Sequence, residues 1–215
     1  MDLHLTEKRI KTYLDEVASE YRFGDASWYL YRLMVSTPQV DFSDDYFEMM
    51  YAVLKSWGMN NRGARMAAFE QMKTSILRSR STIKELSTLR LEKARSLTEG
   101  SVHDKLKELF ETLVLVQEGK PKFVTFAKTM HFLCPHLVAP MDRRNTLVFF
   151  RKNEAALPKG NRQFDLFIEI MEQYRQLSST FNLNKFKDSR WNLSVPKICD
   201  NIVIGYRRLN GANGL

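Results

Sequence analysis

The chain has 215 residues and a formal net charge of +8, and 44% of its residues are hydrophobic while 27% are charged. Its nine glycines and six prolines are too few for a fibrous or disordered protein, and fewer than a turn-rich all-β protein usually carries. No apolar run approaches the ~20 residues of a membrane span, and the charged N-terminus does not resemble a signal peptide. The two cysteines, Cys134 and Cys199, form no CxxC pattern. We therefore expect a cytoplasmic protein with reduced thiols and no membrane partner.

Apolar residues recur with the period of an α-helix in most of the chain. In the N-terminal part, Thr6, Asp25 and Ser43 each precede such a segment, and these residue types favour the N-cap of a helix. A fourth helix is expected from about Gly63 to Leu77. Residues 79–100 are charged and rich in Ser and Thr, and they predict one or two short helices.

In the middle of the chain, the signature Ser101-x-x-Asp104 predicts a helix start, and Gly119 is expected to end that helix. Pro121 fits the first turn of the next helix. Pro135 ends it, because proline cannot continue a helix.

Towards the C-terminus, Asp142 is expected to cap another helix. A loop over residues 153–162 precedes a long helix that contains Phe164–Tyr174. The last helix is expected to start at Ser194.

These segments predict an all-α protein, an orthogonal bundle of about nine or ten helices with short connections. We expect residues 1–215 to form a single domain. If two lobes share its core, their division is expected within residues 79–100.

Charge is distributed unevenly along the chain. Residues 1–59 have a net charge of −4, residues 60–95 of +6, residues 96–141 of zero and residues 142–215 of +6. Basic surfaces of this kind attract polyanions, of which nucleic acid is the commonest. The alternative is a basic protein that meets an acidic protein partner.

The segment from Trp57 to Arg65 combines residues that tolerate left-handed backbone with two arginines at an expected helix start. Such a loop can contact phosphate, while a tryptophan can stack on a base; the alternative is a tight turn with a buried tryptophan. The candidate nucleic-acid-binding residues here are Trp57, Asn60, Asn61, Arg62 and Arg65. Arg78 and Arg80 follow in a basic run with few aromatic residues, which favours backbone contact, although a solvated helix face explains it equally well.

The sequence contains no P-loop, Rossmann, nucleophile-elbow, HExxH or EF-hand motif. His131, Cys134 and His136 are zinc-ligand types, and Cys199 could supply a fourth. Pro135 interrupts this group, so we interpret it as a core thiol with ordinary histidines. We expect no metal and no cofactor.

The most distinctive segment contains Lys128-Thr129 on one expected helix and Pro140-Met141-Asp142 at the start of the next. It resembles part of the helix-hairpin-helix DNA glycosylase core, an all-α family that binds DNA, flips a base and stabilises the sugar cation with an aspartate. The resemblance implies catalytic roles for Asp142 and Lys128. The family's Leu-Pro-Gly-x-Gly turn is absent. The segment is also similar to uncharacterised helical bacterial proteins, and the simplest role of Asp142 is that of an N-cap.

Three functions follow as hypotheses. The first is nucleic-acid (DNA) binding, with or without glycosylase-like catalysis, to which Arg143 and Arg144 would contribute. The second is a helical protein–protein interaction or regulatory role. The third is an enzyme acting on a small phosphorylated substrate at the loop of residues 60–65.

Overall fold

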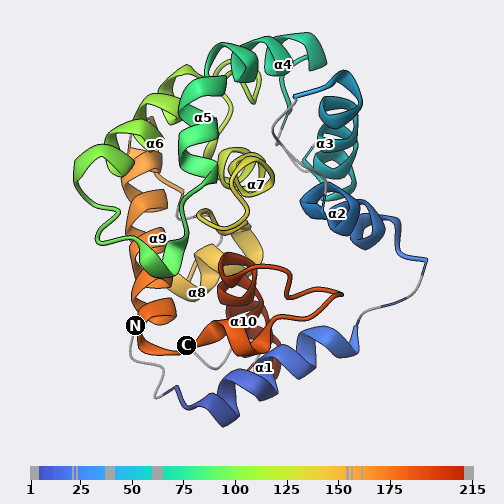
Figure 1. The fold of residues 1–215 in the computed structure, drawn as a ribbon, viewed down its shortest axis with the longest axis vertical. Coiled ribbons are helices and arrows are strands. Elements are labelled where there is room, and N and C mark those ends of the chain that lie inside the picture. The colour runs from blue at the N-terminus through green and yellow to red at the C-terminus, as the bar shows by residue number, and fades with distance from the viewer. Residues whose placement is uncertain are drawn as a thin grey trace.

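The computed structural model describes residues 5–20, 22, 24–36, 42–59, 65–153, 155, 157–160 and 162–210. In this part of the chain the protein forms ten α-helices and no β-sheet, which confirms the all-α prediction (Figure 1). The helices are α1 Glu7–Ser19, α2 Ala26–Ser36, α3 Asp44–Ser56, α4 Phe69–Arg78, α5 Arg80–Ser87, α6 Gly100–Thr112, α7 Phe123–Leu133, α8 Val148–Arg151, α9 Arg162–Thr180 and α10 Val195–Asn210.

Two helices form the centre of the fold. In α7 only Val124 and Lys128 are not fully buried, and in α10 every residue from Val195 to Val203 is buried. Figure 1 shows the other helices arranged around these two, with α1 packed along α10 and α2 beside α3. Because α7 and the first half of α10 are enclosed, any polar side chain on them lies in the interior.

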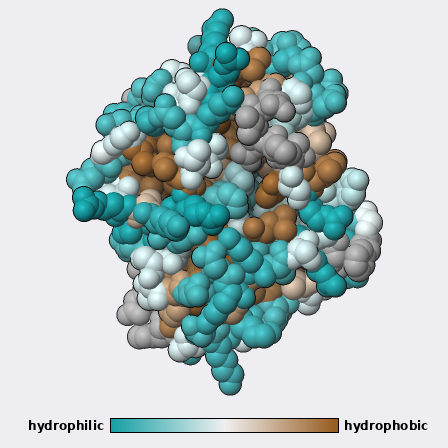
Figure 2. All heavy atoms as spheres, in the orientation of Figure 1, coloured by the Kyte–Doolittle hydropathy of each residue, from teal (hydrophilic) through white to brown (hydrophobic). Residues whose placement is uncertain are grey.

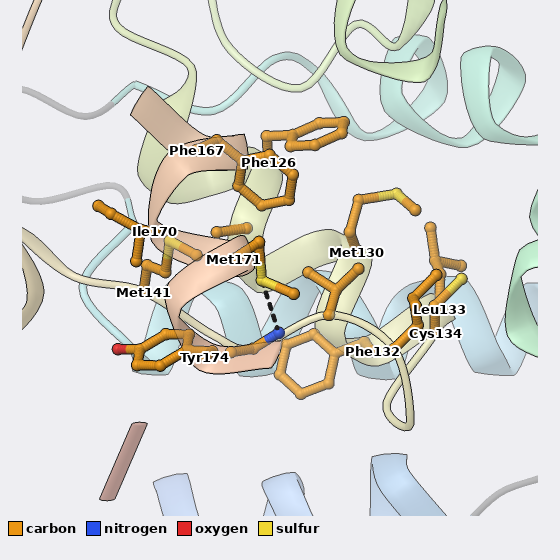
Figure 3. Close-up of a cluster of buried hydrophobic side chains, with 14 of the residues drawn as sticks. Phe126, Met130, Phe132, Leu133, Cys134, Met141, Phe167, Ile170, Met171 and Tyr174 are labelled. Carbon is orange, nitrogen blue, oxygen red and sulfur yellow. Dashed lines mark hydrogen bonds between the residues drawn. The ribbon is translucent and has the colours of Figure 1, made fainter. Parts of the chain in front are cut away.

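Aromatic and sulfur-containing side chains fill the space between α7 and α9. The ring centroids of Phe126 and Phe167 lie 5.1 Å apart, and Met130 and Met171 belong to the same buried cluster (Figure 3). The backbone N–H of Ala139 points at the Met171 sulfur at 3.4 Å. This packing holds the chain between α7 and α8, and thereby Asp142, against α9.

The predicted helix starts at the two ends of the chain are confirmed. The hydroxyl of Thr6 accepts the N–H of Arg9 at 3.3 Å. Asp25 and Ser43 cap α2 and α3 in the same way, and the Ser194 hydroxyl accepts the N–H of Lys197 at 3.3 Å. Local capping chemistry therefore fixes where these helices begin.

Three predicted boundaries are wrong. The fourth helix begins at Phe69 and not near Gly63, which lies outside the described residues. Glu99, not Ser101, precedes α6. That helix ends at Thr112, well before Gly119.

One interaction accounts for two of these errors. Residues 65–67 and 115–117 run antiparallel, with backbone hydrogen bonds from Ala67 to Leu115 (3.1 Å) and from Gln117 to Arg65 (2.9 Å). The run 113–116 is apolar, with Leu113 and Leu115 buried, and it suits an extended pair better than another helical turn.

Figure 2 shows hydrophilic side chains over most of one face, with separate apolar patches between them. Among the helices in the described part of the chain, none is both long and apolar enough to cross a membrane.

Gly205 permits the close approach of α10 to α1. A Cβ placed on it would lie 2.0 Å from the carbonyl oxygen of Tyr13. In an open helix Gly→Ala stabilises by about 0.5–1 kcal/mol. Here the new methyl group must displace backbone, so we expect Gly205→Ala to lower the free energy of unfolding by about 1–3 kcal/mol. Urea unfolding of both proteins measures the difference, and a gain in stability would contradict the close approach.

Candidate functional site

Lys128 is the polar residue of the central helix α7 that is not fully buried. Its ammonium donates a hydrogen bond to the backbone carbonyl of Trp57 at 3.1 Å and lies 5.3 Å from the centre of the Trp57 ring. Burial lowers the pKa of the Lys128 amine, while the carboxylates of Asp142 and Asp200 oppose this shift. A lysine whose pKa is lowered carries a larger fraction of the neutral, nucleophilic amine.

Asp142 caps the helical segment that follows it, as predicted. Its Oδ1 accepts the backbone N–H of Asn145 at 2.5 Å, and its Oδ2 accepts the Asn145 side-chain amide at 2.8 Å. Its own N–H donates to the Thr146 hydroxyl at 3.0 Å. The segment starts with a π-turn over Arg143–Leu147 and continues as α8. The carboxylate is thereby held in one orientation, partly buried, while each oxygen keeps lone-pair capacity for another partner.

A second lysine–aspartate pair lies on α10. Lys197 Nζ and Asp200 Oδ2 are 2.6 Å apart, and their side chains are 4% and 5% exposed. Burial raises the pKa of Asp200 to about 6, although the charge of Lys197 lowers it. Lys128 and Asp142 also act on this carboxyl, which places Asp200 in the same group of charges as the first pair.

Aromatic rings surround the Lys197 ammonium. Its nitrogen lies 4.6 Å from the centre of the Trp191 ring, 5.9 Å from that of Tyr31 and 6.0 Å from that of Trp57. Trp57 therefore contacts both lysines, since Lys128 lies over the same ring. Cation–π attraction offsets part of the cost of removing these ammonium groups from water.

His131 lies beside this cluster as a core residue. Its Nδ1 is 2.7 Å from the carbonyl oxygen of Val138, which can only accept, so Nδ1 carries the proton. Nε2 then accepts the hydroxyl of Tyr31 at 3.1 Å. Burial lowers the pKa of His131 to about 3, and the imidazole is therefore neutral at physiological pH.

The two cysteines that were considered as zinc ligands with His131 contact different backbone carbonyls. The Cys134 thiol lies 3.8 Å from the carbonyl of Ile83, and the Cys199 thiol lies 3.7 Å from that of Tyr174. Burial raises the pKa of both thiols, which makes them poor nucleophiles. Within the described residues, no three His, Cys, Asp or Glu side chains form a group that could hold a metal ion.

The structure brings together some of the predicted site residues. Trp57 and Lys128 are in contact, and the charge of Asp142 acts on Lys128. Trp57 does not offer a free face, because Tyr31 and Phe132 pack against its ring. Asn60, Asn61 and Arg62 lie outside the described residues.

The predicted arginines do not form one surface. Arg65, Arg78 and Arg80 are exposed, and Arg78 and Arg80 flank the junction of α4 and α5 at the upper end of Figure 1. Arg143 and Arg144 are exposed beside α8, in the lower half of that view. A single rigid ligand that contacts both the arginines at the α4–α5 junction and those beside α8 would have to extend along the molecule.

Sequence reasoning missed Lys197, Asp200, Tyr31 and Trp191. One signal was available: Lys197 and Asp200 are spaced i and i+3 within the otherwise apolar start of the last helix. Charges at that spacing inside an apolar run indicate a buried pair.

Comparison of the chain with protein-family models, with curated proteins and with solved structures found no match in any of the three.

Because Lys197 and Asp200 form a buried ion pair, we expect the effects of substituting them on stability to be coupled. Removing one partner leaves a buried charge uncompensated, so we expect Lys197→Met or Asp200→Leu alone to cost about 3–5 kcal/mol. Removing both leaves apolar groups of similar size, so the double variant should be far more stable than the sum of the single losses predicts. Chemical unfolding of the four proteins measures the coupling. Additive losses would show that the two charges do not depend on each other.

His131 predicts a specific pH dependence. Its pKa of about 3 in the folded chain lies below its ordinary value of 6.5, so below pH 6.5 the unfolded chain binds a proton that the folded chain does not. The free energy of unfolding therefore falls as the pH drops from about 6.5 towards 3, by up to about 1.4 kcal/mol per pH unit for this residue. His131→Gln should lose this component of the slope. The matched control, His103→Gln, changes a partly exposed histidine and should keep this component, and equal slopes in the two variants would refute the assignment.

Proposed function

We propose that this protein binds DNA and acts on it as a glycosylase-like enzyme, with the Lys128 amine as nucleophile and the Asp142 carboxylate as the group that stabilises positive charge on the sugar. The observation that carries the proposal is the state of Lys128. Its amine is largely enclosed in the protein and bonded to the Trp57 carbonyl, and burial together with the charge of Lys197 lowers its pKa against the opposing charges of Asp142 and Asp200.

The chemistry needs a neutral amine beside a fixed negative charge. The amine attacks C1′ of a 2′-deoxynucleotide, and a C–N bond forms as the bond from C1′ to the base breaks. The base leaves with the bonding electron pair and takes up the proton that the amine releases. The C1′–O4′ bond of the sugar then breaks with its electron pair on O4′, which takes up the second amine proton, and an imine forms between Lys128 and C1′. Positive charge develops on the sugar as the bond to the base breaks. The Asp142 carboxylate is already fixed by its hydrogen bonds to Asn145, so it stabilises this charge without reorganising.

Basic residues beside Asp142 support a DNA substrate. Arg143 and Arg144 directly follow the aspartate and are exposed. The Asn145 side chain is committed to Asp142, so the arginines are the nearest groups on this segment that can reach a phosphate.

The imine provides the test. We would incubate the protein with duplex DNA that carries either damaged bases or an abasic site, reduce with borohydride, and measure the covalent protein–DNA adduct. We expect the wild type to form an adduct and Lys128→Met to form none. Lys11→Met, which removes an exposed lysine from α1, is the matched control and should react as the wild type does.

Two substitutions of Asp142 distinguish a catalytic role from a helix-capping role. Asn caps a helix about as well as Asp, so Asp142→Asn should keep its stability, whereas Asp142→Ala should lose about 0.5–2 kcal/mol. Both variants should release damaged bases about 10²–10³-fold more slowly than the wild type, because a neutral side chain cannot stabilise the sugar cation. An adduct that persists in Lys128→Met, or full activity in Asp142→Asn, would overturn the proposed roles.

A further inference from the structure

A large hollow lies on the surface beside the start of α7 and the residue that follows Asp142. It has a volume of about 1010 Å³. Four separate stretches of the chain line it: the end of α6, the connection before α7, the start of the segment after Asp142, and the described residues of the loop before α9 together with the start of α9. Four of its lining residues are basic, namely Lys120, Lys122, Arg143 and Lys159, and one is acidic, Glu111.

The floor of this basic hollow is held rigidly. The Gln163 side-chain oxygen accepts the backbone N–H groups of Lys122 at 2.9 Å and of Phe123 at 3.1 Å, which ties the start of α9 to the start of α7. The Lys122 ammonium donates to the carbonyl of Phe110 and lies 5.4 Å from the centre of its ring. Burial lowers the pKa of Lys122 to about 8, against the charge of Glu111, and its hydrogen bond to Phe110 makes this lysine part of the wall of the hollow.

Two exposed lysines at the rim remain available to a ligand. Lys120 and Lys159 form no ion pair with any residue that the structure describes, and they come from segments 39 residues apart in the sequence. Since Gln163 already accepts the first N–H groups of α7, an anion here would be held by side-chain ammonium and guanidinium groups. Cations from three segments around a hollow of this size suit a chain of phosphates better than a single small anion.

We propose that this basic hollow is the docking surface for the phosphate backbone of duplex DNA, with Lys120, Lys159 and Arg143 contacting successive phosphates. The inference rests on the proposed function, and it places the DNA next to Asp142, the residue before Arg143. We therefore expect most of the affinity for duplex DNA to come from this basic hollow and little to come from the basic run of residues 60–95.

The test compares lysines in three places. Fluorescence anisotropy with a labelled duplex would be measured for wild type, Lys120→Gln, Lys159→Gln and two controls. Each hollow variant loses one phosphate contact and should bind about eightfold more weakly at 0.1 M salt, with the slope of log affinity against log salt reduced by about one. The controls Lys84→Gln, in the basic run on α5, and Lys8→Gln, on α1, should bind as the wild type does.

Several results would overturn the proposal. Equal losses in Lys84→Gln and Lys120→Gln would mean that charge anywhere on the surface suffices. Unchanged duplex binding in both hollow variants would exclude the hollow as the DNA-docking surface. This conclusion would hold even if the same variants bound heparin more weakly.

The imine assay keeps this inference separate from the proposed reaction. Lys128→Met should form no adduct whatever its affinity for the duplex, so adduct formation and duplex affinity are measured separately. If the wild type forms no adduct but the hollow variants lose affinity, the docking surface stands and the reaction fails. If adduct forms and the hollow variants bind and react normally, the reaction stands and the docking surface fails.

Discussion

A pair of opposite charges is buried in α10, one of the two helices at the centre of the fold. Lys197 and Asp200 lie on the enclosed first half of α10, where every neighbouring residue is also buried. Such a pair rarely adds stability relative to apolar residues of the same size, because each charge gives up its hydration. The Lys197 ammonium instead lies near aromatic rings from α2, the turn after α3 and the loop before α10, and the cation–π contacts require these three segments to pack around α10.

That requirement connects the interior to the candidate site. Trp57 is one of the rings over Lys197, and its backbone carbonyl and its ring also receive Lys128. The position of the Lys128 amine on α7 thus depends on the packing that satisfies Lys197 on α10. The lowered pKa of Lys128 is then a property of this whole assembly, since burial causes it and charges from two other segments modify it.

Under the proposed function, Asp142 meets a structural and a chemical demand together. As an N-cap it accepts hydrogen bonds from the backbone and side chain of Asn145, and these bonds fix its carboxylate. A fixed carboxylate needs no reorganisation when positive charge develops nearby, which is the condition for electrostatic stabilisation. The arginines that follow and the basic hollow beside them extend this polar edge of the molecule to the surface.

The sequence by itself determined the all-α class, most helix starts and the core thiols, because caps and apolar periodicity act within a few residues. Thr6, Asp25, Ser43, Asp142 and Ser194 could all be identified in this way. A resemblance in the sequence also suggested Lys128 and Asp142 as candidate catalytic residues, a prediction that stays untested, and it did not specify what surrounds them. Only the tertiary structure decided that the segment before α4 pairs with residues 115–117, and that Trp57 meets Lys128 across 71 positions of sequence. Such contacts depend on how whole helices pack, and no local pattern specifies which helix will lie against which.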